Sequence, residues 1–465
     1  MTTKGVERRR LRWAVAVVVL AANTMDILDA TIVNVAAPSV HQDLGGSTSS
    51  VQWLSAGYTL AFAVLLVTAA RLGDIFGRRR IFLAGLAGFT LTSAACAVAP
   101  NVVLLIGARV LQGGFGALML PQSFGLIKEV FDDEEIVKVT NLFGPSTGLA
   151  MLGAPVLAGA LIDADLWGIG WRLVFLINVP IGLLALPLAL CSLPRSISHP
   201  GLRLDIWGVW LIGLALVAII YPLIQGRSEG WPMWTLALFA VGVVLLYTFV
   251  HYERTRCHNA LIEPALFTNR DYLSGIAIVL CIFGAFGGLL FCISLYGQLG
   301  EGWSAIRSGL ALTPMVVGMI LGMPASSTLA RRIGRRVLYF GTLLMASGVL
   351  VLSGMLTVGW GGSMWSLFPG LFLVGAGAGA TFGQLFQFVL NSVSMEEVGS
   401  ASGIMDAAEQ LSTALGVAVL GTIFFALFQH PGDALRVTAL ACLPSLGVAL
   451  VFVSRLPVWP DSENN

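Results

Sequence analysis

The segment ARLGDIFGRRR (Ala70–Arg80) separates two long apolar stretches and carries four arginines in eleven residues. A related segment, LARRIGRR (Leu329–Arg336), also joins two apolar stretches. Basic loops between apolar helices are typical of the cytoplasmic side of polytopic membrane proteins. A loop of this kind that occurs twice therefore predicts a helical membrane protein with an internal repeat.

The composition of the whole chain supports this prediction. Of the 465 residues, 57% are apolar and 11% are charged, whereas roughly a quarter of the residues are charged in a soluble protein. This composition excludes a water-soluble chain and makes the lipid bilayer an expected partner. The 26 basic and 25 acidic residues nearly balance, so no nucleic-acid partner is expected, because phosphate binding needs a concentrated basic face.

Apolar runs of membrane-spanning length recur along the chain. A hydrocarbon core about 30 Å thick requires roughly 20 apolar residues of helix. Fourteen runs meet this requirement, which predicts an all-α integral membrane protein with 14 transmembrane helices. The predicted spans are residues 12–36, 51–70, 80–99, 102–127, 138–162, 171–193, 205–225, 231–252, 272–299, 306–330, 336–357, 364–390, 402–429 and 435–454.

The distribution of basic residues predicts the orientation. With a cytoplasmic N-terminus, 21 of the 26 Lys and Arg residues lie in inner segments, four lie in outer loops, and Arg109 lies within a span. Cytoplasmic loops retain basic residues during insertion. We therefore expect a multi-pass protein of the cell (plasma) membrane with both termini in the cytoplasm.

The spacing of the repeated loop predicts the domain organisation. The two basic loops join spans 2 and 3 and spans 10 and 11, so they lie eight spans apart instead of six. Two inserted spans between two six-helix bundles explain the difference. The expected units are an N-terminal bundle (1–195), two inserted transmembrane helices with their linkers (196–260) and a C-terminal bundle (261–465).

Several segments resemble motifs of the fourteen-span drug:proton antiporter family of the major facilitator superfamily, the multidrug efflux type. They are LDATIVNVAAP (28–38), QWLSAGYTLAFA (52–63), the loop at 70–80, RVLQGGFGA (109–117) and WRLVFLINVPIG (171–182). The resemblance implies the major facilitator fold and transport by alternating access.

The fifth span is similar to the antiporter motif of that family. Its sequence is TGLAMLGAPVLAG (147–159), and Ala154 and Ala158 stand where the family pattern has Gly. The resemblance implies that Gly153, Pro155 and Gly159 contribute to gating.

Five ionisable residues within spans are candidates for proton coupling: Asp26, Asp29, Arg109, Asp406 and Glu409. A charge in hydrocarbon is costly and marks a functional site by default. Within each acidic pair the spacing of three residues places both carboxylates on one helix face, where repulsion and poor solvation favour keeping a proton. The resemblance also implies coupling or cation-recognition sites in the first and thirteenth spans.

Depth links Asp29 to Arg109. Each lies about seven residues, or roughly 10 Å, from the predicted outer surface. We expect Asp29 to alternate between protonation and an ionic contact with Arg109. The alternatives are a structural hydrogen bond for Asp29, interfacial water around the other three acids, and a purely structural Arg109.

Polar and aromatic residues on the spans are candidates for substrate binding. Such side chains can stack on and hydrogen-bond to a bulky amphipathic cation. For Tyr58 the alternative is an interfacial aromatic belt. The candidates are Asn34, Tyr58, Gln112, Phe382, Gln384, Phe386 and Gln387.

The first basic loop is a candidate gate. Asp74 and Arg78 are one helical turn apart and can form an ion pair, and Gly77 and Arg79 complete the motif. We expect this contact to latch the cytoplasmic side. The alternative is that the arginines only fix the topology.

We expect a secondary active transporter that exports small amphipathic, cationic drugs or antibiotics in exchange for protons and acts as a monomer. The proton gradient is the expected energy source, without a cofactor. A proton-coupled symporter or facilitator for an organic metabolite is the alternative. A membrane enzyme is a third class, but the chain has no GxSxG, HExxH or GxxxxGK[ST] pattern, and its Cys and His residues show no metal-ligand spacing.

Overall fold

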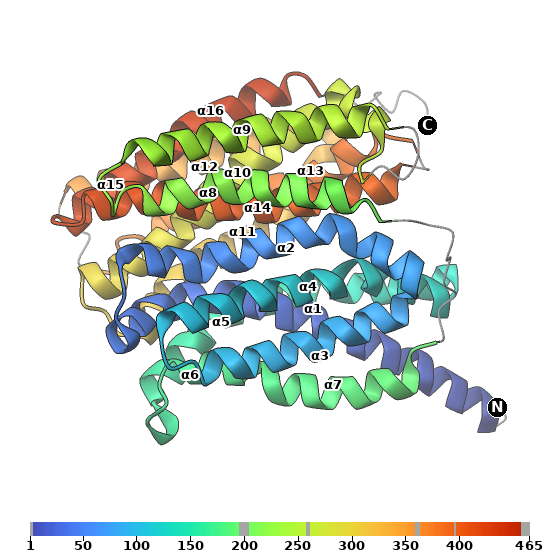
Figure 1. Ribbon diagram of the computed structural model, residues 1–465. Coiled ribbons are helices and arrows are strands. Elements are labelled where there is room, and N and C mark those ends of the chain that lie inside the picture. The colour runs from blue at the N-terminus through green and yellow to red at the C-terminus, as the bar shows by residue number, and fades with distance from the viewer. Residues whose placement is uncertain (1–2, 195–203, 257–260, 359–362, 395–396, 457–465) are drawn as a thin grey trace.

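The computed structural model of the chain describes residues 3–194, 204–256, 261–358, 363–394 and 397–456, and these contain helices and no strand. Figure 1 shows the helices running side by side, with the start of α1 and the end of α16 at the same end of the bundle. We call this the termini end and the opposite one the far end. The helices are α1 (Thr3–Leu44), α2 (Thr48–Phe76), α3 (Arg78–Ala97), α4 (Val102–Val130), α5 (Asp133–Ala164), η1 (Leu166–Gly168), α6 (Arg172–Leu176), α7 (Asn178–Ser192), α8 (Ile206–Gln225), α9 (Met233–Arg254), η2 (Pro264–Phe267), α10 (Arg270–Leu295), η3 (Tyr296–Gly300), α11 (Ala305–Ile333), α12 (Arg336–Thr357), α13 (Phe368–Leu390), α14 (Val398–Ala426), α15 (Pro431–Leu440) and α16 (Cys442–Val453).

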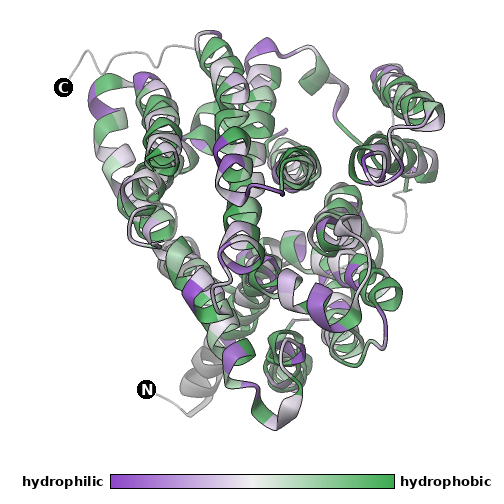
Figure 2. Ribbon diagram, turned by 90° about the vertical axis from the view of Figure 1, so that its left-hand side faces the viewer, coloured by the Kyte–Doolittle hydropathy of each residue, from purple (hydrophilic) through white to green (hydrophobic). Residues whose placement is uncertain are grey.

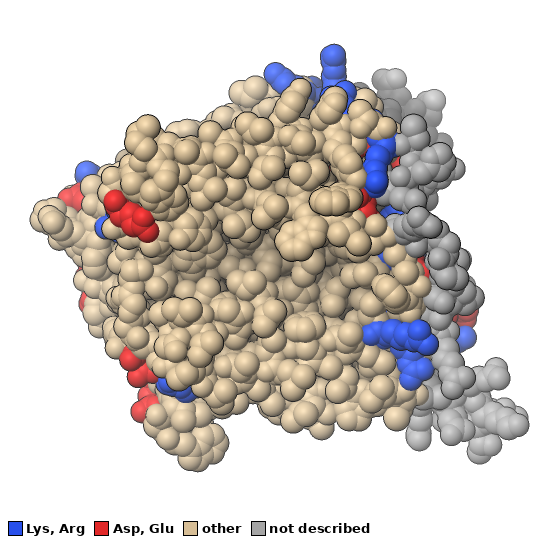
Figure 3. Space-filling view, in the orientation of Figure 1, with Lys and Arg blue, Asp and Glu red and all other residues tan. Residues whose placement is uncertain are grey.

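Fourteen of the described helical segments are long and apolar enough to cross a membrane, and each overlaps one predicted span, so the predicted number is confirmed. Figure 2 looks along the bundle and shows the helices coloured mostly hydrophobic. Figure 3 shows a broad band free of charged side chains, with Lys, Arg, Asp and Glu gathered at the two ends. The chain is a multi-pass membrane protein.

The limits of the spans differ from prediction where proline interrupts the helix. Predicted spans 171–193 and 435–454 are each two helices, divided at Ile177 and at Ala441. In both, a proline follows the division by three residues, at Pro180 and Pro444. Proline has no N–H to donate to the carbonyl four residues earlier, so the helical ladder opens there. The first helix also runs further than predicted, to Leu44.

The helix contacts repeat between the two parts of the chain. Within the first part, α4 packs against α2 and α3, and α1 packs against α5 and α7; within the last part, α13 packs against α11 and α12, and α10 packs against α14 and α16. The inserted helices α8 and α9 pack against each other, and α8 also contacts α2 and α14. The predicted unit boundaries near 195 and 260 lie outside the described residues and stay predictions.

Glycine allows the closest of these contacts. A Cβ atom on Gly375 of α13 would overlap the carbonyl oxygen of Met315 on α11, and one on Gly416 of α14 would overlap the carbonyl oxygen of Gly284 on α10. Small residues let helix backbones approach closely in lipid. The GAGAG segment (375–379) therefore packs α13 against its neighbouring helices.

The first part of the chain contacts the last part at the far end. There α5 packs on α11, and α2 packs on α14. Hydrogen bonds join the two parts from Gln52 Nε2 to Val417 O (3.1 Å), from Gln298 Nε2 to Val35 O (2.8 Å), and from Ala305 N to Asp163 Oδ1 (3.1 Å). These contacts close the far end in this conformation.

The turn between α8 and α9 reinforces this closure. Arg227 donates hydrogen bonds to Thr48 Oγ1 at the start of α2 (3.2 Å) and to Phe425 O at the end of α14 (2.6 Å). Partial burial lowers the pKa of Arg227 below its ordinary value. The turn of the inserted pair thus bridges the two bundles that the sequence predicts.

We expect Gly375→Ala to lower the apparent melting temperature of the purified protein, because overpacking a tight helix contact costs about 1–3 kcal/mol. The matched control is Gly354→Ala on α12, where an added Cβ meets nothing within 4 Å. Heating followed by fluorescence-detected size exclusion measures both. Equal melting temperatures for the two variants would contradict the close α11–α13 contact.

Candidate functional site

A fully buried ion pair lies at the centre of the first bundle. Arg109 on α4 donates from Nη1 to Asp29 Oδ2 on α1, and neither side chain has exposed surface. The Arg109 Nε also donates to Leu54 O on α2 at 3.1 Å. Two charges without water require nearly complete pairing. Three helices supply it for Nη1 and Nε of Arg109, whereas its buried Nη2 has no hydrogen-bond partner among the described residues.

Two amides complete the surroundings of the Asp29 carboxylate. Gln112 Nε2 and Asn178 Nδ2 each donate to Asp29 Oδ1 at 2.9 Å. Asn178 begins α7, directly after the division at Ile177, and also donates to Ser93 Oγ (3.2 Å). Sequence reasoning missed Asn178, although it lies within the WRLVFLINVPIG segment that resembles a family motif.

Tyr58 joins this ion pair to the second acid of α1. Its hydroxyl donates to Asp26 Oδ1, and its ring centroid lies 4.3 Å from the guanidinium carbon of Arg109. Gly116 makes room for the contact, because a Cβ there would lie 3.1 Å from both Asp26 Oδ1 and the Tyr58 hydroxyl. Asp26 is half-buried, whereas Asp29 is fully enclosed.

Glu409 approaches this cluster from α14 in the other part of the chain, and Asp406 lies three residues before it on the same helix. Glu409 lies close enough to Asp406 and Asp26 for their charges to interact. Both α14 acids are half-buried, and within the described residues neither is in an ion pair. The structure thus brings Asp26 and Glu409, which were predicted as separate pairs, toward each other across the two bundles.

The residues predicted to bind substrate fall into separate groups. Phe382 stacks on Phe283 of α10 with ring centroids 3.9 Å apart, Phe386 is half-buried, and Asn34 is buried with its Oδ1 atom unpaired. Gln384 instead points to α11, with Nε2 3.5 Å from Ser326 Oγ.

Three other candidates have different surroundings. Tyr58 and Gln112 are buried within the Asp29–Arg109 cluster, and Gln387 is exposed. The seven candidates therefore do not form one continuous surface in this conformation.

The loop predicted to act as a gate has the expected ion pair. Arg78 Nη2 lies 3.4 Å from Asp74 Oδ1, and its Nη1 lies 3.8 Å from Glu129 Oε1 on α4. Gly77 between α2 and α3 has φ +93°, a conformation that favours glycine. Arg79 donates to Leu190 O on α7 at 2.6 Å.

The residues of the fifth-span motif lie along the contact between α5 and α11. A Cβ on Gly159 would overlap the backbone of Ile306, and a Cβ on Gly309 would overlap the carbonyl oxygen of Pro155. Gly153 has open space around it. Gly159 and Pro155 therefore lie where the two parts of the chain meet. A Cβ added to Gly153 would not reach α11.

Two related sets of membrane-spanning helices, with a buried ion pair on the first and fourth spans, define a polytopic transport protein. Residues 19–417 match the profile of the Major Facilitator Superfamily. The chain belongs to this superfamily and is therefore a membrane transporter and not an enzyme.

Its relatives include named export and resistance proteins of Streptomyces. It is 44% identical over 440 residues to a "probable actinorhodin transporter" of Streptomyces coelicolor, covering 93% of this chain and 76% of the relative. It is 33% identical to a tetracenomycin C resistance and export protein of Streptomyces glaucescens, covering 88% and 76%. It is 36% identical to a puromycin resistance protein of Streptomyces alboniger, covering 89% and 82%.

Solved structures agree on the fold. An autoinhibited peptide transporter of the POT family superposes with a TM-score of 0.67 at 12% identity, covering 98% of this chain and 99% of that one. A bacterial homolog of the human lysosomal transporter Spinster superposes with a TM-score of 0.64 at 15% identity, covering 95% and 96%. The predicted major facilitator fold is confirmed.

Removing Asp29 should destabilise the protein strongly. Asp29→Ala leaves Arg109 charged, buried and short of an acceptor, a loss of about 3–5 kcal/mol. We expect the double variant Asp29→Ala, Arg109→Ala to recover part of the lost melting temperature. The control is Asp74→Ala, which breaks an exposed pair of about 0–1 kcal/mol; a double variant less stable than Asp29→Ala would contradict a paired charge at this site.

Proposed function

We propose that the protein exports amphipathic, cationic antibiotics or related drugs across the plasma membrane in exchange for protons. It acts as a monomer by alternating access, with both termini in the cytoplasm and the proton gradient as its energy source. Its similarity to actinorhodin, tetracenomycin C and puromycin export or resistance proteins supports efflux of antibiotic-like molecules.

The observation that carries the proton-coupling proposal is the enclosed Asp29–Arg109 pair. An ionised Asp29 accepts hydrogen bonds from Arg109, Gln112 and Asn178, so it holds α1, α4 and α7 together. A proton on Asp29 removes the charge that Arg109 requires and weakens this arrangement. Protonation of Asp29 is then coupled to movement of α1, α4 and α7.

The charge balance between the bundles supports a cationic substrate. Asp26, Asp406 and Glu409 are half-buried acids, and within the described residues none of them is in an ion pair. Either protons or a positively charged molecule can compensate these carboxylates inside the membrane. A drug cation that binds here displaces protons, which gives exchange in place of cotransport.

The closed far end gives this conformation its place in the proposed cycle. With cytoplasmic termini, the far end faces the exterior, so this conformation is closed to the outside. Opening it requires separation of α5 from α11 and of α2 from α14. The Asp74–Arg78–Glu129 contacts at the termini end then act as the latch on the opposite side.

Transport in everted membrane vesicles tests proton exchange. With an acidic lumen, we expect a fluorescent lipophilic cation to accumulate in the lumen, and Asp29→Asn to reduce this accumulation at least tenfold while a thermal-shift assay still detects binding. Vesicles without the protein correct for passive uptake. Accumulation only with an alkaline lumen would contradict exchange and favour the symporter, and unchanged transport by Asp29→Asn would remove Asp29 from the coupling.

Two glycine substitutions on one helix test the closure of the far end. Gly159→Ala places a Cβ against the backbone of Ile306, whereas Gly153→Ala places one in open space. We expect Gly159→Ala to reduce vesicle uptake about tenfold, because the far end no longer closes fully, and Gly153→Ala to retain most of it. Equal transport by the two variants would show that the α5–α11 contact is not part of the cycle.

A further inference from the structure

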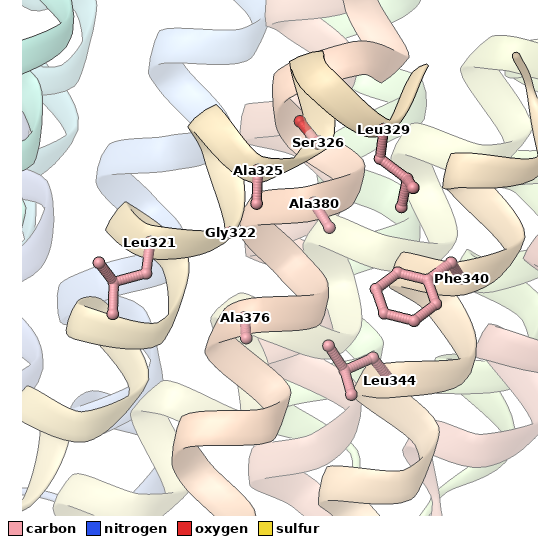
Figure 4. A pocket seen from close by; sticks show the side chains of 9 residues that line it. All are labelled: Leu321, Gly322, Ala325, Ser326, Leu329, Phe340, Leu344, Ala376 and Ala380. Carbon is pink, nitrogen blue, oxygen red and sulfur yellow. The ribbon is translucent and has the colours of Figure 1, made fainter. Parts of the chain in front are cut away.

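A groove of about 190 Å³ lies on the outer face of the last part of the chain, between α11 and α12 (Figure 4). Leu321 and Leu329 of α11 form one wall, Phe340 and Leu344 of α12 form the other, and Ala376 and Ala380 of α13 form the floor. Leu321 and Phe340 are 56% and 51% exposed, so the groove faces the bilayer. Proton-coupled export assigns no role to this groove.

Small residues create this groove. A Cβ on Gly322 would overlap the carbonyl oxygen of Ala376, so the backbones of α11 and α13 touch behind it. Larger side chains form the walls, and Ala325 between them is too small to fill the space. Its volume exceeds the roughly 150 Å³ of an engineered apolar cavity that binds benzene and stays free of water. An apolar molecule of the bilayer is therefore its natural occupant.

The groove lies in the half of the membrane next to the termini end. Leu329 is four residues and Leu321 twelve residues before Ile333, where α11 ends. At 1.5 Å per residue, the groove extends from roughly 6 to 18 Å below the α11–α12 turn. This is the depth of the acyl chains of the adjacent leaflet.

Each wall of the groove ends in an arginine. Arg332 follows Leu329 by three residues on α11, and Arg336 precedes Phe340 by four residues on α12, so each shares a helix face with a wall residue. Both are exposed, and within the described residues neither is in an ion pair. The neighbouring Arg335 is engaged instead, because its Nη1 donates to Ser454 O at 3.2 Å.

We propose that this groove binds an anionic phospholipid, with one acyl chain between α11 and α12 and the phosphate between Arg332 and Arg336. The apolar walls fit the chain, and the two arginines select a net negative headgroup over a zwitterionic one. Basic residues at the end of an intramembrane groove are a known arrangement for anionic lipids. The bound lipid would connect α11 and α12 on the outer face of the bundle, because these two helices make few direct contacts with each other.

Native mass spectrometry of the full-length protein tests this proposal. The protein in detergent is equilibrated with equal amounts of phosphatidylglycerol and phosphatidylcholine that carry identical acyl chains. We expect the native protein to prefer phosphatidylglycerol on the order of tenfold, and we expect this preference to be about fivefold smaller in Arg332→Gln. Arg331→Gln is the matched control, because it removes the same charge from an adjacent exposed residue on another face of the helix.

A second variant tests binding of the acyl chain independently of the headgroup. Ala325→Phe fills the groove without changing the charge, and we expect it to reduce binding of both lipids, with folding checked by size exclusion. Three results would overturn the proposal: equal binding of the two lipids by the native protein, an equal loss in Arg331→Gln and Arg332→Gln, or unchanged lipid binding by Ala325→Phe.

Discussion

The Asp29–Arg109 ion pair is the constraint on which the arrangement of the first bundle depends. Side chains or backbone from α1, α2, α4 and α7 supply its hydrogen bonds. Because an unpaired buried charge costs several kcal/mol, these helices cannot move independently while both groups are ionised. The division at Ile177 is part of the same arrangement, since it places Asn178 at the start of α7 beside the carboxylate. Protonation of Asp29 therefore changes the contacts of all four helices at once.

The two parts of the chain repeat their helix contacts but not their chemistry. The first part contains a carboxylate with a matched cation, whereas α14 brings Glu409 toward Asp26, and within the described residues neither of these acids is in an ion pair. The proposed cycle needs this asymmetry. In that proposed cycle, Asp29 changes its contact with Arg109 when it binds a proton, and the acids without an ion pair exchange protons for a positively charged substrate.

The sequence predicted local features better than contacts between distant segments. Fourteen spans and the duplication follow from hydropathy and from a repeated loop, and both are properties of short segments. The roles of Pro180 and Pro444 could have been recognised, because a proline within a span opens the helical ladder. The approach of Glu409 to Asp26 and the turning of Gln384 toward α11 depend on how helices rotate about their axes in the packed bundle. A sequence of mostly apolar helices contains little information about that rotation, because almost every face is hydrophobic.

Contacts within each part differ from the contacts that close the far end, and in the proposed cycle this difference lets each bundle stay rigid while the far end opens. Within the last part, glycines such as Gly375 place backbone against backbone along much of α11 and α13. Between the parts, α5 touches α11 in the same manner at Gly159, but other links include side-chain hydrogen bonds to carbonyl oxygens, as from Gln52 and Arg227. Such bonds contribute about 1 kcal/mol net, or somewhat more from a charged donor, and water can replace them when the far end opens. The inserted α8–α9 pair adds to this reversible set by bridging α2 and α14, so it stabilises one end of the cycle without restricting the interior of either bundle.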